Sequence, residues 1–225
     1  MRYAYRSRAP HIEIYTEQCS ACQIRSMRSD AKKNYEHLLA VARVVIANEG
    51  AEASLRDIAR KAGVGLGTLY RHFPTRDALL EALLRMGFDE LAASAAKHET
   101  SNSPEHALVS WIHEVVTGAH GYRGVVTAMM AAIQDPGSAL HASCVAMRSA
   151  GTRLLARAQA KGAVRADLDG TDLFALIGSL VWLRDQQVFA EREEHLFEVV
   201  MDAILTSRKA STQTKKKSTR SRRRQ

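Results

Sequence analysis

The chain has 225 residues, of which 46% are apolar, so it is long enough to bury a hydrophobic core and is not an intrinsically disordered protein. Its net charge of +8 is unevenly distributed. Residues 208–225 hold nine Lys and Arg and no acidic residue, whereas residues 86–207 hold fifteen acidic and nine basic residues. A polyanion would therefore be attracted to the two ends of the chain and not to its middle.

The cysteine pattern excludes a disulfide framework and a zinc site of the usual spacing. Cys19 and Cys22 form a single C-x-x-C, no second pair follows, and Cys144 stands apart. We therefore expect free thiols in a reducing compartment, with no metal and no cofactor.

The sequence also gives no sign of a membrane segment. The first 13 residues contain no apolar stretch of the signal-peptide kind, and the longest apolar run, residues 175–183, is far too short to span a bilayer. We expect a soluble, cytoplasmic protein without a membrane partner.

The two ends of the chain are predicted to be disordered. Residues 1–27 have mixed polarity and no clear period, and the segment from Met27 is typical of a protein start, so both Met1 and Met27 are candidate initiators. Residues 208–225 form a tail of Lys, Arg, Ser and Thr that contains no core-forming residue.

Three helices are expected before residue 75. The first begins near Asp30 and ends at Gly50. The second begins at Ser54, where Asp57 three residues on resembles a capping box, and the third spans roughly residues 66–72 and ends before Pro74. The apolar face of the first helix recurs at three- and four-residue steps, at Leu38, Leu39, Ala42, Val45 and Ile46.

Six further helices are expected after Thr75, which we interpret as an N-cap. They begin near residue 76 and at Pro104, and then cover about 125–134, 139–160, 172–189 and 192–207. The predicted fold is therefore all-α: a three-helix head in residues 28–75 followed by a six-helix body in residues 76–207.

The segment 54–73, SLRDIARKAGVGLGTLYRHF, has the spacing of a helix-turn-helix. Ala59 is small where the two helices would cross, and Gly63 stands where the turn needs a positive φ. Val64 and Leu69 supply apolar contacts that would fix the second helix against the first. The alternative is an ordinary helical hairpin with no role in DNA recognition.

In the helix-turn-helix interpretation, small residues at the start of the second helix allow its N-terminus to approach the major groove. Hydroxyl, guanidinium, imidazole and ammonium groups around it would contact base edges and phosphates. The candidate DNA-binding residues are Lys32, Lys33, Ser54, Arg56, Gly65, Leu66, Gly67, Thr68, Tyr70, Arg71, His72 and Arg76.

Residues from about 30 to 84 resemble the N-terminal domain of the TetR/AcrR family of bacterial transcriptional regulators. The resemblance is carried by SLRDIA from Ser54, by AGV at 62–64, by GTLY at 67–70, by HFP at 72–74 and by DALL at 77–80. It implies a DNA-binding head, a fourth linking helix and a variable body that dimerises and binds a ligand. Leu66 and Arg76 depart from the commoner choices of the family without disrupting the fold.

Two residue sets in the body follow from this interpretation. The last two helices would form a dimer interface through Leu173, Ile177, Leu180, Val181, Leu196, Val199, Val200, Ala203 and Ile204. A pocket for an effector would use Trp111, His113, Met129, Met130, Cys144, Met147, Arg148, Phe174 and Trp182, with His120 and Tyr122 as further polar candidates. The alternative for both sets is packing within one chain.

The function predicted from these features is sequence-specific transcriptional regulation. We expect a homodimeric repressor that binds a palindromic double-stranded DNA operator and is relieved by a small apolar or amphipathic effector. One alternative is a non-specific nucleic-acid binder driven by the basic tail. The other is an enzyme, which we do not expect because the catalytic motifs H-E-x-x-H and G-x-S-x-G and the phosphate-binding glycine loops do not occur.

Overall fold

A computed structural model of the chain describes residues 32–122, 124–184 and 186–206. The extension predicted for residues 1–27, with Cys19 and Cys22, and the basic tail at 208–225 lie outside these ranges. The described residues are almost entirely helical, and their β pairing is limited to an isolated antiparallel bridge between Val164 and Leu205. The predicted all-α class is confirmed. No helix among the described residues has the length and apolar character that crossing a membrane requires.

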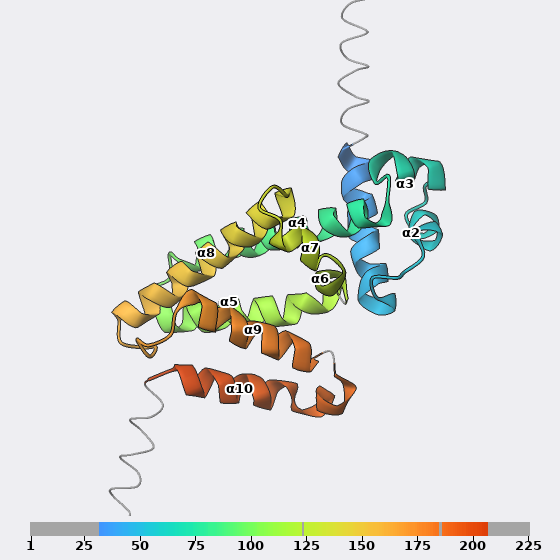
Figure 1. Ribbon diagram of the computed structural model, residues 1–225. Helices are drawn as coiled ribbons and strands as arrows, with labels where there is room; N and C mark the ends of the chain where they lie inside the picture. Colours follow the sequence, from blue (N-terminus) through green and yellow to red (C-terminus); the bar gives the residue numbers. More distant parts are fainter. Residues whose placement is uncertain (1–31, 123, 185, 207–225) are drawn as a thin grey trace, which may run out of the picture.

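The head contains three helices: residues 32–49, α2 (Leu55–Lys61) and α3 (Leu66–His72) (Figure 1). The predicted cap of α2 is present, because the Ser54 hydroxyl accepts a hydrogen bond of 3.3 Å from the Asp57 backbone N–H. Gly63 closes the turn between α2 and α3 with a φ of +68°, a conformation that favours glycine.

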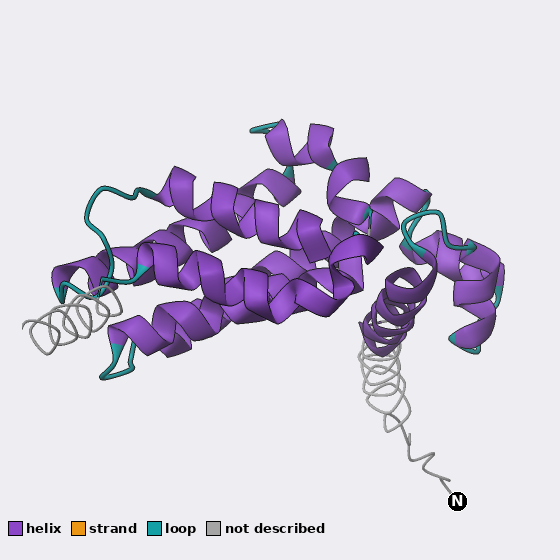
Figure 2. Ribbon diagram, turned by 90° about the horizontal axis from the view of Figure 1, so that it is seen from below, coloured by secondary structure: helices purple, strands orange, loops and turns teal. Residues whose placement is uncertain are grey.

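The body begins with the long helix α4, whose N-cap Thr75 accepts a hydrogen bond of 3.0 Å from the Ala78 N–H. Figures 1 and 2 show the longer helices of the body as an elongated bundle with the head at one end. The elements are α4 (Arg76–His98), α5 (Pro104–Gly118), the 3₁₀ helix η1 (Ala119–Tyr122), α6 (Val125–Ala128), α7 (Met130–Gln134), α8 (Ala139–Ala160), α9 (Gly170–Arg184), the 3₁₀ helix η2 (Gln187–Arg192) and α10 (Glu193–Ile204).

Two of the predicted helices differ from the structure. The helix expected at 125–134 is broken at Met129, whose side chain is buried in the core and whose backbone is not helical (φ −101°, ψ 11°). The helix expected at 172–189 ends at Arg184, and η2 follows it. The Arg184 guanidinium pairs with Glu193 at 3.3 Å, so the end of α9 is tied to the start of α10.

The apolar core is divided into two clusters, and the division does not follow the predicted boundary at residue 75. One cluster joins the three head helices to the first half of α4 and to Val125, Met129 and Leu140. The other fills the body between α5, α8, α9 and α10. The helix-turn-helix is therefore packed on elements of the body, and a shift of α6 or α7 must disturb the core of the head.

The centre of the body core is built around Trp111, which is fully buried. Its indole N–H donates a hydrogen bond of 2.9 Å to the Leu91 carbonyl, and its ring meets Phe174 edge to face, 6.1 Å between centroids. Helix α8 comes this close to the indole only because residue 151 is glycine: a Cβ there would lie 2.6 Å from Trp111 Cζ3.

We predict that Gly151→Ala lowers the free energy of unfolding by about 1–3 kcal/mol, because the added methyl group overpacks the core against Trp111. The matched control is Gly118→Ala, at the end of α5, where a Cβ meets nothing within 4 Å. Urea unfolding followed by circular dichroism measures both. Equal stability of the two variants would contradict the assigned packing.

Candidate nucleic-acid interface and body cavity

Helix α3 is seated on α2 by two buried side chains. Ala59 and Leu69 lie in the head core with essentially no exposed surface. The backbone fixes the turn between them, because the Val64 N–H donates to the Ala59 carbonyl at 3.0 Å and the Thr68 N–H donates to the Gly65 carbonyl at 2.9 Å. The tilt of α3 relative to the head is therefore set by packing and by hydrogen bonds together.

The opposite side of α3 is open. Gly65, Gly67, Tyr70 and Arg71 are exposed, while Thr68 is half-buried. Figure 1 shows α3 at the periphery of the head, away from the bundle. This arrangement leaves small, hydroxyl and guanidinium groups available on one short helix, which is what entry into a DNA groove requires. Of the other predicted contacts, Lys32, Lys33, Ser54 and Arg56 are exposed, and Leu66 and His72 are half-buried.

Among the candidate DNA-binding residues, His72 and Arg76 contact parts of the head that are distant from them in sequence. The His72 ring packs edge-on against Tyr35, 6.1 Å between centroids. The Arg76 guanidinium donates to the carbonyls of Ala51 and Ala53 at 2.8 and 2.7 Å, and so holds the connection that precedes α2. The sequence did not indicate this structural role, because backbone carbonyls far along the chain leave no pattern of side chains.

A cavity of about 550 Å³ lies within the body, a volume typical of small-molecule sites, which span roughly 300–1,000 Å³. Its walls come from α4, α5, α8 and α9, with η1, α6 and α7 at the end that faces the head. Most of the lining is apolar. The polar or charged side chains in it are Arg43, Glu90, Ser94, Glu114, Tyr122, Cys144 and Arg148.

The structure places some of the predicted pocket residues on this wall and others elsewhere. Met130, Cys144, Met147, Arg148 and Phe174 line the cavity.

The other four predicted pocket residues do not line this cavity. Trp111 and Met129 are buried in the two apolar clusters behind the wall. His113 lies outside the cavity, with its ring edge-on to Phe197 at 5.3 Å. Trp182 is 60% exposed on the outer side of α9, because the inner side of that helix is taken by Ile177 and its neighbours.

Sequence reasoning missed several polar residues of the wall, and Arg43 is the most instructive of them. Arg43 belongs to the first helix of the head, outside residues 76–207, where the sequence predicts the pocket. Glu90, Ser94 and Glu114 lie on α4 and α5 among residues that the helical period assigns to a solvated side. Only the crossing of these helices shows that they border a cavity.

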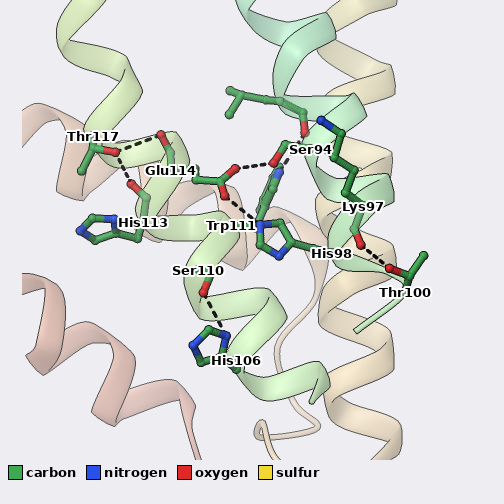
Figure 3. A network of polar contacts seen from close by, with 11 residues as sticks. Ser94, Lys97, His98, Thr100, His106, Ser110, Trp111, His113, Glu114 and Thr117 are labelled. Carbon is green, nitrogen blue, oxygen red and sulfur yellow. Dashed lines mark hydrogen bonds and ion pairs between the residues drawn. The ribbon is translucent and has the colours of Figure 1, made fainter. Parts of the chain in front are cut away.

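Glu114 is held by a network that joins α4 to α5 (Figure 3). Its carboxylate accepts hydrogen bonds from the Ser94 hydroxyl and from His98 Nε2, the latter at 2.8 Å. Burial raises the pKa of Glu114. The two hydrogen bonds and the nearby charges of His98 and Lys97 outweigh it, so the pKa lies below its ordinary value of 4.5. The carboxylate on this wall is therefore ionised and already paired.

The Cys144 thiol is the softest polar group of the wall. Burial raises its pKa above the ordinary value of 9.0, and the positive charge of Arg148 opposes that rise only in part. At neutral pH the side chain is therefore a neutral thiol and behaves as a small apolar group.

Four residues of the predicted dimer interface lie inside their own chain. Leu173, Ile177, Leu180 and Ile204 are buried in the body core of their own chain, where α9 packs on α5, α8 and α10. The surface that α9 and α10 leave exposed is a different one. It comprises Ala175, Gly178, Ser179 and Trp182 of α9 with Val199 and Ala203 of α10, while Val181, Leu196 and Val200 are half-buried.

Comparison with known proteins connects this architecture to a family. Residues 38–83 match the model of bacterial regulatory proteins of the tetR family, and residues 103–205 match the C-terminal domain of SbtR-like transcriptional regulators. A TetR transcriptional regulator from Streptomyces coelicolor is 33% identical, with 76% of this chain and 98% of that protein superimposed at a TM-score of 0.60. The chain belongs to the TetR family.

Further relatives agree with this TetR assignment. A TetR transcription regulatory protein from Mycobacterium vanbaalenii is 31% identical, covers 80% of this chain and 99% of its own, and has a TM-score of 0.59. An HTH-type transcriptional regulator of Staphylococcus aureus is 38% identical over 64 residues, which span 28% of this chain and only 35% of that relative. These relatives agree with the prediction that the protein is a helix-turn-helix transcriptional regulator of the TetR family.

We predict that Glu114→Gln lowers the free energy of unfolding of this TetR regulator at neutral pH by about 1 kcal/mol, after allowance for solvent screening. The folded-state pKa of Glu114 is depressed, so its stabilisation is present above 4.5 and is lost as the pH falls through the folded-state pKa. The difference in melting temperature between wild type and variant should therefore shrink as the pH is lowered below 4.5. A difference that stays constant with pH would contradict the ionic pairing.

Proposed function

We propose that this TetR regulator is a repressor that binds a palindromic operator as a homodimer and is released by a small apolar or amphipathic effector. In this proposal residues 28–75 form the DNA-binding domain, and residues 76–207 form the ligand-binding and dimerisation domain. The protein regulates and does not catalyse. It acts in the cytoplasm, where chromosomal DNA is accessible.

The observation that carries the proposal is the seating of α3. Ala59 and Leu69 fix the helix by its inner side, and the outer side presents Tyr70 and Arg71 to solvent. In this proposal Thr68 contacts a base edge, whereas the phenol of Tyr70 and the guanidinium of Arg71 contact phosphate oxygens. The net positive charge of the N-terminal part of the chain supports the approach to DNA.

Relief of repression by an effector is supported by the α6–α7 segment, which borders both the cavity and the core of the head. Met130 and Val126 line the cavity from α7 and α6, while Val125 and Met129 of the same segment are buried in the head core. A molecule that binds one spacing of these walls better than another shifts the position of the head. The shift in population between the two head positions cannot exceed what the effector's difference in affinity for them provides.

Dimerisation is supported by the exposed apolar surface on α9 and α10. Trp182 and Val199 are 60% and 50% exposed, although large apolar side chains gathered on a surface are unfavourable in water. Gly178 on the same helix leaves room for close approach of a second copy. A dimer is also what a palindromic operator needs, because two α3 helices must enter successive major grooves.

We predict that Arg71→Ala weakens operator binding about tenfold or more and reduces the slope of log affinity against log salt, because one phosphate contact is lost. The operator is first selected from a random pool of duplexes, and affinities are then measured by fluorescence anisotropy at several salt concentrations. Arg153→Ala, an exposed arginine of α8 in the body, is the matched control and should bind normally. Loss of binding in both variants would contradict the assigned role of α3.

A chain that ends at Ser207 separates sequence reading by the head from non-specific attraction by the basic tail. Retained preference for the selected operator, with a smaller salt slope, supports the proposal. Complete loss of binding in the truncated chain would favour the tail as the DNA-binding element.

We predict that Val199→Asp converts the dimer to a monomer, because the charge would be buried between two copies without a partner. The matched control is Val145→Asp on α8, where the valine is 47% exposed, close to the 50% of Val199. Sedimentation equilibrium gives the mass of each. If Val199→Asp remains dimeric, the interface lies on another surface.

A further inference from the structure

The end of the cavity nearest the head carries a cluster of three polar side chains from three different elements. Arg43 comes from the head helix at residues 32–49, Glu90 from α4 and Tyr122 from η1, and all three line the cavity. The rest of this end is apolar, formed by residues such as Val126 and Met130. The cluster is therefore the place where a polar group of a bound molecule would meet the head directly.

Arg43 contacts both of the other side chains. Arg43 Nη1 donates to Glu90 Oε2 at 3.1 Å, and the guanidinium carbon lies 5.2 Å from the centre of the Tyr122 ring. Gly87 allows the phenol to lie against α4, because a Cβ at that position would be 2.6 Å from Tyr122 Cζ. The phenol is therefore held between the Arg43 guanidinium and the backbone of α4 at Gly87.

The Tyr122 side chain lines the cavity, and its hydroxyl is buried beside Gly87 of α4, where no group among the described residues is a hydrogen-bond partner for it. Buried hydroxyl groups nearly always have a partner, so one that lacks it is a site where an acceptor would be bound favourably. Burial also raises the pKa of Tyr122, more than the charge of Arg43 lowers it. The phenol therefore stays protonated and can donate.

The charges on the wall favour an anionic acceptor. A guanidinium has five N–H donors, and in the contacts described Arg43 gives one of them to Glu90. The Glu90 side chain is 53% exposed, so it can turn into water at little cost. The other carboxylate, Glu114, is held by Ser94 and His98, and the guanidinium of Arg148 pairs with no carboxylate among the described residues.

We propose, on the basis of the proposed function, that the effector is an amphipathic monocarboxylate whose carboxylate replaces Glu90 and accepts hydrogen bonds from Tyr122 and Arg43. Its apolar body occupies the cavity between α4, α5, α8 and α9. Carboxylate and guanidinium form charge-assisted, often bidentate pairs, which explains why an arginine and a neutral donor stand together here.

The exchange of partners also accounts for relief of repression. The Arg43–Glu90 pair joins the first head helix to α4, so its loss removes one tie between the head and the linking helix. The ligand carboxylate replaces Glu90 as the partner of Arg43 and binds it from the cavity. The position of the first head helix then depends on the ligand and no longer on this contact with α4. The free energy that couples ligand binding to operator release is then the difference between the ligand's binding free energies for the states with and without the Arg43–Glu90 pair.

The first experiment compares two carboxylate probes, decanoate and 4-butylbenzoate, with the corresponding alcohols. Binding is measured by calorimetry with the full chain, and release of the selected operator is measured by anisotropy. We expect both carboxylates to bind at least tenfold more tightly than their alcohols and to release the operator. Equal affinity, or no binding of either carboxylate, overturns the proposal.

Two variants at the cluster are expected to act in opposite directions. Tyr122→Phe should weaken decanoate binding about tenfold, without lowering the melting temperature, because the lost hydroxyl has no partner among the residues that the structure describes. Glu90→Gln should strengthen decanoate binding, because it removes the competing carboxylate. Glu99→Gln, which removes a carboxylate paired with Arg153 on the surface, is the matched control and should leave decanoate affinity unchanged.

A merely structural role of the cluster would weaken decanoate binding in both Tyr122→Phe and Glu90→Gln, and this result overturns the assignment. Failure of this inference is distinguishable from failure of the proposed function. A wild-type protein that binds its selected operator but no carboxylate refutes the ligand class alone, whereas a protein that selects no duplex refutes the operator-binding repressor itself.

Discussion

The arrangement of this regulator depends on the apolar cluster that joins the head helices to α4 and to the segment around α6 and α7. Ala59 and Leu69 hold α3 in position from within that core, and Val125 and Met129 enter the same cluster from the far side. A small three-helix head buries little surface by itself, so its geometry also depends on α4 and on the segment that packs against it. DNA recognition in this chain is therefore a property of the whole cluster.

The same cluster explains how a cavity in the body can be mechanically connected to DNA. Its wall and the head core are opposite sides of the α6–α7 segment, only one residue layer apart. Polar connections reinforce the apolar one, since Arg43 reaches from the head to Glu90 and to the Tyr122 ring. Close-packed interiors transmit displacement, and here the path between cavity and α3 crosses few contacts.

The sequence predicted the head well because its requirements are local. A cap at Ser54, a left-handed turn at Gly63 and a small residue at 59 are short-range constraints that leave a clear pattern. The body depends on which helices cross, and periodicity does not contain that information. Periodicity therefore places Trp182 inside and gives no sign that Arg43 borders a cavity, because both positions are decided by tertiary contacts alone.

The break at Met129 leaves α6 with four residues and α7 with five. Helices of one turn gain little from their own hydrogen bonds and persist only while neighbouring side chains hold them. This part of the wall is thus the cheapest to unwind, and amide hydrogen exchange there should be faster than in α4 or α8. The cavity can therefore hold ligands of different length, because α6 and α7 unwind before the long helices of the body are forced apart.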